Sequence, residues 1–150
     1  NPIIYDKDYE FKIGKSITLR EGKDITIFCA GAMVYQSLEA AKILESKNIY
    51  SKVVNMHTIK PIDKEAIDEA CKFSKTIISV EEHNVIGGLG SAIAEYKSSI
   101  KNSPKQIILG IQDYYSKGGD YKFLKEKHRL TIDKLVEDIQ IGISGKRREV

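Results

Sequence analysis

The chain has 150 residues, the length of one ordinary domain and enough to bury a hydrophobic core unaided. Its hydrophobic fraction of 41% and charged fraction of 30% are typical of globular proteins and argue against a disordered chain. The formal charge is +3, but much of that excess lies in the last five residues, "KRREV", so no basic block within the fold suggests a nucleic-acid partner.

The first half of the chain alternates strand and helix patterns. Residues 1–15 mix polar and aromatic side chains without a period, which predicts an extended arm or linker. "SITL" (16–19) is a short strand candidate, and "ITIFCA" (25–30) is apolar enough for a strand buried on both faces. On loop length alone these two strands would pair as a hairpin. A helix is expected over 34–47.

The second half continues the alternation. Strands are expected at 51–56, 75–80 and 105–112, and Asp63 is a suitable N-cap for a helix that runs to residue 73. Two more helices are expected from apolar stripes, the first after residue 90 and the second after a polar loop that includes residues 113–120. The residues of these stripes are Ile93, Tyr96 and Ile100, then Ile132, Leu135, Val136 and Ile139 with Thr131 as the cap.

Strands that alternate with helices predict right-handed crossovers and a mainly parallel sheet covered by helices on both faces. We expect one domain over 16–140, followed by a flexible basic tail at 141–150. No apolar run approaches the roughly 18 to 20 residues of a membrane span, and the first residues do not resemble a signal peptide. Cys29 and Cys71 lie outside any C-x-x-C pair, which favours two reduced thiols in the cytoplasm.

The stretch "VEEHNVIGGLGSAIAEY" (80–96) places three glycines, Gly87, Gly88 and Gly90, between a strand and a helix. The dinucleotide fingerprint G-x-G-x-x-G/A is incomplete here, because its third position holds Ile93, although Asp113 follows about 20 residues later. No G-K-[ST] sequence completes a P-loop. The pattern therefore favours a tight strand-to-helix turn over a phosphate site, and it leaves the phosphate site open.

Two acids and a histidine precede these glycines. In an extended segment Glu81 and His83 would share one side and Glu82 would face away. At the carboxyl end of a strand they would occupy the crevice where α/β proteins bind ligands, and His57, after another strand, would face it too. The alternative is a carboxylate that bonds backbone amides at a helix start. Neither pattern establishes catalysis.

Four segments together resemble a known family. "GKDITIFCAGAMVYQSLEAAKILESKNI", "VVNMHTIKPID", "VEEHNVIGGLGSAIAE" and "GIQDYYSKGGDYKFLKEKHRLTIDKLVEDI" are similar to the C-terminal domain of transketolases. Deoxyxylulose-phosphate synthase and the β-subunits of 2-oxo-acid dehydrogenases share this domain type. Among these branches, the sequences "IKPID" and "EEHNVIGGLGSAIAE" favour transketolase. The resemblance implies a three-layer α/β/α sandwich whose five-stranded sheet is mostly parallel. Its first strand would be antiparallel, with another strand between it and the second.

The resemblance also implies a function. Transketolases transfer two-carbon ketol units between sugar phosphates, using thiamine diphosphate and a divalent metal, Mg or Ca, held between two other domains. Residues 1–15 would then lead from a preceding pyrimidine-binding domain, and no G-D-G signature of the diphosphate domain occurs here. The chain is thus expected to be an assembly domain, inactive alone, with the remaining domains or a separate subunit as partner and a dimer as the full enzyme.

No residue is expected to be catalytic, to bind the cofactor or to hold a metal. The candidate residues of a crevice or interface are His57, Glu81, Glu82, His83, Gly87, Gly88, Gly90 and Asp113. Aromatic candidates for contact with a partner are Tyr5, Tyr9, Phe11, Tyr114 and Tyr115. Two alternatives remain: a regulatory module that binds a small molecule or nucleotide in the strand-end crevice, and an autonomous oxidoreductase.

Overall fold

The structure, a computed structural model, describes residues 3–5 and 8–145. Within them the strands are β1 (Ile17–Arg20), β2 (Ile25–Cys29), β3 (Ser51–Asn55), β4 (Thr76–Asn84) and β5 (Lys105–Ile111). The helices are α1 (Met33–Ser46), α2 (Lys64–Phe73), α3 (Leu89–Lys97), α4 (Tyr121–Lys127) and α5 (Ile132–Ile143). No helix among the described residues is long and apolar enough to cross a bilayer.

The five strands form one sheet in the order β1-β3-β2-β4-β5. β1 runs antiparallel to β3, whereas β3, β2, β4 and β5 are mutually parallel. The architecture implied by the resemblance is therefore confirmed, and the hairpin expected from loop length is wrong. The reason lies at Gly22, where a Cβ atom would overlap the backbone of Ser51 and Lys52. The turn after β1 thus crosses closely over the start of β3, and only a glycine lets it pass.

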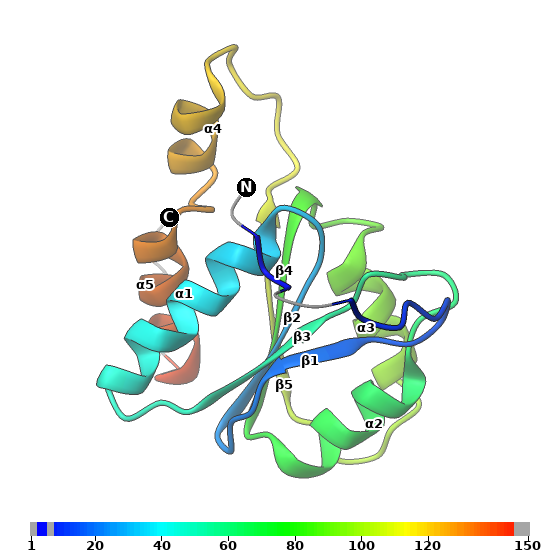
Figure 1. Cartoon of the computed structure of the whole chain (residues 1–150). Coiled ribbons are helices and arrows are strands. Elements are labelled where there is room, and N and C mark those ends of the chain that lie inside the picture. The colour runs from blue at the N-terminus through cyan, green and yellow to red at the C-terminus, as the bar shows by residue number, and fades with distance from the viewer. Residues whose placement is uncertain (1–2, 6–7, 146–150) are drawn as a thin grey trace.

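Helices cover both faces of the sheet, as Figure 1 shows, with α1 and α5 on one side and α2 and α3 on the other. Each pair encloses a separate apolar cluster. One cluster joins α1 and α5 to the sheet through residues such as Leu44 and Ile139, and the other joins α2 and α3 through Ile67 and Ile93. The central strand β2 is buried along its whole length, as its apolar sequence predicts.

Several element ends differ from the expectations. β4 continues to Asn84, so the two acids and the histidine lie within the strand and not beyond it. α3 ends at Lys97, which leaves Ile100 outside the helix. α5 continues to Ile143, past the expected domain end at residue 140. The second half of the expected basic tail, residues 146–150, lies outside the described residues.

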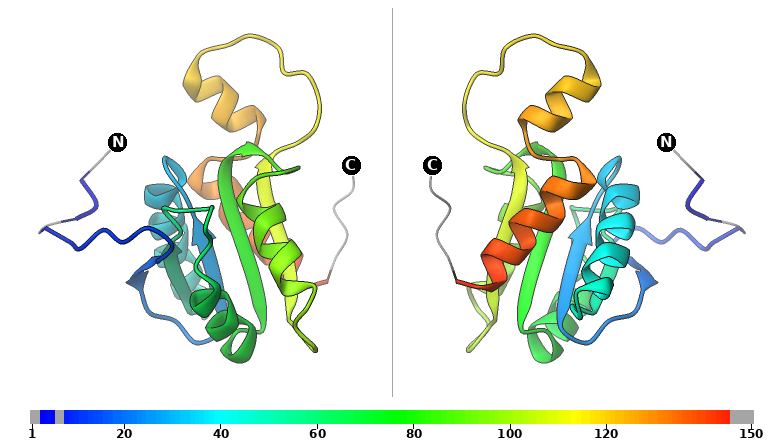
Figure 2. Two further views of the ribbon diagram at one scale, coloured as in Figure 1. Left: turned by 90° about the vertical axis from the view of Figure 1, so that its right-hand side faces the viewer. Right: turned by 90° about the vertical axis from the view of Figure 1, so that its left-hand side faces the viewer.

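α4 was not expected from the sequence. It has seven residues and none of them is buried, so it lacks the apolar stripe that would have identified it. Its N-cap is Asp120, whose side chain accepts a hydrogen bond from the amide of Phe123. The expected Thr131 cap of α5 makes no side-chain capping bond, and its hydroxyl donates a hydrogen bond to Glu126 on α4. Figure 2 shows α4 and the preceding loop projecting from the rest of the domain.

The arm before β1 contains no helix or strand in its described part. The rings of Tyr5 and Tyr9 stack at 4.0 Å, and the Asn55 side-chain amide donates to the Tyr5 hydroxyl at 2.7 Å. The arm thus lies along the end of β3. Closer to β1, Asp63 caps α2 as expected and also accepts hydrogen bonds from the amide and hydroxyl of Ser16, which ties α2 to the start of the sheet.

Candidate functional site

A crevice of about 360 Å³ lies at the carboxyl ends of β2 and β4, the place where open α/β sheets bind ligands. One wall consists of small residues, Ala30, Gly31 and Ala32, between β2 and α1. Gly31 has φ of +57°, a left-handed conformation that a glycine adopts without strain. The opposite wall comes from β4 and the glycine turn, and its residues are Glu81, Glu82, His83, Gly87 and Gly88, while Ile59 completes the rim.

Glu81 is the deeply enclosed carboxylate of the crevice, with 3% of its surface exposed. Its two carboxylate oxygens accept hydrogen bonds from the backbone amides of Leu89 at 2.6 Å and Gly90 at 2.8 Å. These amides begin α3, whose N-cap residue Gly88 has no side chain to offer. A carboxylate from the neighbouring strand therefore caps this helix, and it occupies the position that a bound phosphate would need.

The glycines of the turn have separate roles. A Cβ atom at Gly88 would overlap the Glu81 carboxylate and lie 3.0 Å from Nδ1 of His83, so the missing side chain makes room for the cap. A Cβ at Gly90 would press on Ile108 and on the hydroxyl of Ser79, so this glycine lets α3 approach the sheet. Gly87 has φ of +79°, and its amide donates to the Ser91 hydroxyl at 2.9 Å.

Close packing of helix against strand thus occurs at Gly90. Ile93, in the third position of the incomplete dinucleotide fingerprint, is fully buried in the core between α3 and the sheet. Ile93, the residue that makes the fingerprint incomplete, is thus a side chain of the hydrophobic core. The turn is built for packing, as the sequence pattern favoured.

His83 and Glu82 are both exposed and both border the crevice. His83 faces Gly88 as Glu81 does, but its Nδ1 lies 2.9 Å from the carbonyl oxygen of Asn84. Glu82 was expected to face away. It borders the crevice because the β4–β5 register shifts between Val80 and Asn84, which interrupts the alternation of side chains.

Glu82 also connects the crevice to α4. Its carboxylate accepts a hydrogen bond of 3.1 Å from the hydroxyl of Tyr121. Partial burial, and then this hydrogen bond, raise the pKa of Tyr121 above its usual value, so the hydroxyl remains the proton donor. The projecting helix is thereby tied to the end of β4.

Two of the expected residues lie elsewhere. His57 is not part of the crevice wall, and its ring packs against Phe11 of the arm at 4.5 Å between centroids. Asp113 accepts a hydrogen bond of 3.1 Å from the Asn84 side chain, at the loop after β5. Both follow strand ends as predicted, but the arm covers one, and the other supports the turn from outside the crevice.

The chemistry that this arrangement permits is limited. No lysine or arginine lines the crevice among the described residues, and its two carboxylates would repel an anion. No group of three His, Cys, Asp or Glu side chains suited to a metal ion occurs in the described part of the chain. Cys29 is deeply buried, and burial raises its pKa to about 12, so this thiol is a packing residue.

Comparison with known proteins shows the family to which the chain belongs. A family model described as "Transketolase, C-terminal domain" matches residues 14–134, most of the chain. The chain belongs to the transketolase C-terminal domain family. It is 40% identical over 134 residues to the 6-deoxy-6-sulfo-D-fructose transketolase subunit SqwH of a Clostridium species, covering 89% of this chain and 41% of that protein. It is 38% identical over 130 residues to the 1-deoxy-D-xylulose-5-phosphate synthase of Dictyoglomus turgidum, covering 87% and 21%.

Solved structures give the same family. A split-gene transketolase described as an inactive β4 tetramer superimposes with a TM-score of 0.89 at 38% identity, over 97% of this chain and 48% of that one. A transketolase from Campylobacter jejuni, with a TM-score of 0.65 and 21% identity over 85% of this chain and 18% of that one, shares the fold. The transketolase C-terminal domain described here thus spans less than half the length of each of these relatives.

In this transketolase C-terminal domain two features of the site could not be predicted from the sequence: the side of β4 on which Glu82 lies, and the contact of Glu82 with α4. The bond between Tyr121 and Glu82 depends on α4, which has no buried stripe to signal it. The one local signal is the pair of glycines followed by Asp120, a suitable N-cap.

Proposed function

We propose that the chain acts as the C-terminal assembly domain of a thiamine-diphosphate-dependent transketolase, an enzyme that transfers two-carbon ketol units between sugar phosphates. The observation that carries this proposal is the match along most of the chain to proteins named as transketolase subunits, of which it spans less than half. In this proposal thiamine diphosphate and its Mg or Ca ion are bound by other domains, and this chain is inactive alone. Its location is cytoplasmic, which its two free cysteines favour.

The partner is the set of domains that bind the cofactor, either in the same polypeptide or in a separate subunit, and the full enzyme is at least a dimer. The projecting aromatic surface, which we define as Tyr114, Tyr115, Tyr121 and Phe123, supports a docking role. Each of these side chains is about half exposed or more, and Tyr115 is fully exposed. Aromatic residues exposed in this way are enriched at interfaces between proteins.

The first test uses the purified chain alone and then together with a polypeptide that carries the thiamine-diphosphate domains. We expect no heat when the chain is titrated with thiamine diphosphate and magnesium, and no conversion of xylulose 5-phosphate and ribose 5-phosphate. We expect conversion when both polypeptides are present. Turnover or saturable cofactor binding by the chain alone would refute the proposal.

A docking variant tests the surface itself. Tyr115→Ala should weaken association with the cofactor-binding polypeptide by about tenfold or more, since interface aromatics often dominate binding. Tyr50→Ala is the matched control, because Tyr50 is also exposed but follows α1, away from α4. Equal binding by the two variants would remove the aromatic surface from the interface.

The branch of the family is the second question. The match to 1-deoxy-D-xylulose-5-phosphate synthase is nearly as high in identity, so that activity is the alternative for the whole enzyme. We favour transketolase because similar relatives that are themselves short proteins carry that name. Assaying the reconstituted enzyme with pyruvate and glyceraldehyde 3-phosphate separates the two, since only the synthase would use this pair.

A regulatory role for the crevice is supported by its volume of about 360 Å³, which suits a small molecule. Its chemistry argues against nucleotides, because Glu81 already holds the first amides of α3 and because no lysine or arginine lines the walls among the described residues. We therefore expect a flat calorimetric titration with NAD. Saturable binding of NAD that is lost in Gly88→Val would instead support the regulatory or oxidoreductase hypothesis.

A further inference from the structure

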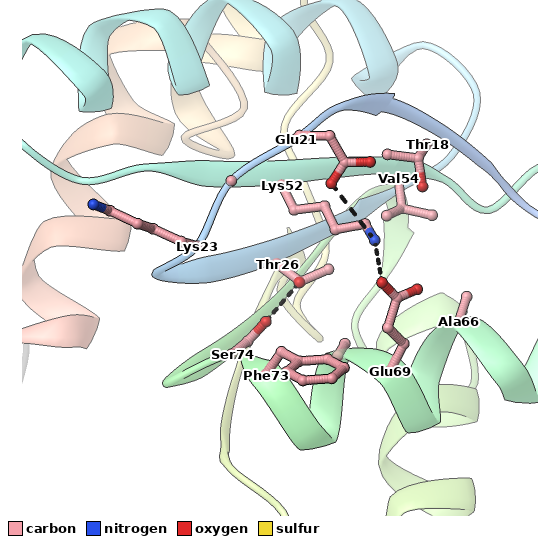
Figure 3. A pocket seen from close by; sticks show the side chains of 12 residues that line it. Thr18, Glu21, Lys23, Thr26, Lys52, Val54, Ala66, Glu69, Phe73 and Ser74 are labelled. Carbon is pink, nitrogen blue, oxygen red and sulfur yellow. Dashed lines mark hydrogen bonds and ion pairs between the residues drawn. The ribbon is translucent and has the colours of Figure 1, made fainter.

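A second cavity, of about 340 Å³, lies between α2 and the edge of the sheet formed by β1 and β3. Figure 3 shows it with Lys52 of β3 near its centre and with Glu21 and Glu69 directed toward the lysine from opposite sides. Its walls come from three strands, the turn after β1, and α2, and it shares no lining residue with the crevice at the ends of β2 and β4. Its volume falls in the range of small-molecule sites.

Lys52 has donors to spare in this cavity. Its side chain is 14% exposed, and its ammonium donates one hydrogen bond, of 2.7 Å, to Glu69. Glu21 is 3.9 Å away, close enough for an ion pair but too far for a hydrogen bond. An ammonium has three N–H donors, so two of them have no acceptor within the described part of the protein.

The charge of the cavity restricts what it can bind. Two carboxylates face one ammonium, because Lys23 extends away and lies over the ring of Tyr50, 4.8 Å from its centroid. The local charge is therefore negative, which disfavours phosphates and other anions. A cation would meet Lys52 at the centre. The ligand that fits best is uncharged.

Donors and acceptors alternate around the cavity. The spare ammonium donors can bind oxygen acceptors, whereas the partly exposed carboxylates of Glu21 and Glu69 can accept further hydrogen bonds. At the other end the hydroxyls of Thr26 and Ser74 lie 2.7 Å apart, and one of their two hydrogens remains available to a ligand. Hydroxyl groups both donate and accept, so several of them on one molecule would satisfy these side chains together.

The remaining wall is apolar. The ring of Phe73 lines the cavity while 66% of the residue is exposed, a high value for an aromatic side chain. Such a ring offers a flat face to carbon-bound hydrogens. We propose that this cavity binds a neutral polyhydroxylated molecule, a sugar or a polyol without a phosphate. The proposal goes beyond the assembly role and does not depend on it.

The test is a titration of the isotopically labelled full chain, followed by amide NMR. The probes are D-ribose, D-xylose and xylitol, with ribose 5-phosphate as the charged comparison. We expect saturable shifts in the millimolar range for at least one neutral probe, at the amides of Glu21, Lys52, Phe73 and their neighbours. We expect much weaker shifts there for ribose 5-phosphate.

Variants assign the shifts to the cavity. Phe73→Ala should weaken binding by about three- to tenfold, and Lys52→Met should abolish it. Phe123→Ala is the matched control, since that ring is similarly exposed but lies on α4. If Lys52→Met fails to fold, the effect of Phe73→Ala alone tests whether the shifts arise from binding in the cavity. No saturable shifts with any neutral probe, equal or tighter binding of ribose 5-phosphate, or shifts unchanged in the variants would overturn the proposal.

Discussion

Replacing Glu81 by glutamine tests whether this carboxylate is a structural cap or a group available for ligands. A carboxylate accepts at both oxygens, and here each oxygen meets one backbone amide of α3. In glutamine one of those positions becomes an NH₂ group, so one amide faces a donor in a site that is almost fully buried. Losing a charged hydrogen bond in this way costs about 2–3 kcal/mol. Losing the negative charge beside the helix N-terminus adds about 0.3–1 kcal/mol.

We therefore expect Glu81→Gln to lower the free energy of unfolding by about 2–4 kcal/mol. Urea denaturation followed by circular dichroism measures it. Glu82→Gln is the control, because the adjacent carboxylate is exposed and its loss should change the free energy of unfolding by less than about 0.5 kcal/mol. If the two variants were equally stable, the carboxylate of Glu81 would not hold α3, and the cap interpretation would be refuted.

Three further predictions concern stability and reactivity. Gly88→Ala should lower the free energy of unfolding by about 1–3 kcal/mol, because its Cβ would overlap the capping carboxylate, whereas Gly118→Ala, in open space, should be neutral; urea midpoints compare them. Burial opposes ionisation of Asp63, but hydrogen bonds from Ser16 and the α2 amide outweigh it and lower its pKa. Its stabilisation is thus present above the ordinary pKa of about 3.9 and disappears as the pH falls through the lower folded value. The stability gap between the parent and Asp63→Asn should then shrink in acid, and a gap independent of pH would contradict this. A thiol reagent should modify Cys29 only after unfolding, because burial raises its pKa to about 12; rapid labelling of the folded chain there, detected by mass spectrometry, would disprove it.

The parts of the fold that were predictable are those with a strong local signal. β2 could be identified because its sequence is β-branched and almost entirely apolar, and α2 because Asp63 is a suitable N-cap; the structure confirms both. α4 could not be identified, because no residue in it is buried. The place of β1 was also inaccessible to local reasoning, since a four-residue turn resembles a hairpin whether or not another strand intervenes.

Part of the candidate site could likewise be predicted from the sequence, and part could not. That a carboxylate would bond amides at a helix start was one of two interpretations of the acidic pair, and the contacts of Glu81 decide between them. The shift in the β4–β5 register, which brings Glu82 to the crevice, leaves no mark on the sequence. The cavity around Lys52 was not expected, because its walls combine side chains from three strands, one turn and one helix.

The place of β1 has a consequence for biosynthesis. Within the described residues β1 pairs only with β3, so during synthesis β1 has no native partner in the sheet until residues 51–55 have followed it. During that interval β1 and β2 are both present, joined by a turn short enough for a non-native hairpin. Any such hairpin would have to separate before β3 could enter between the two strands. Slow translation between residues 29 and 51 would lengthen the time during which β1 and β2 can pair with each other, whereas rapid translation would shorten it.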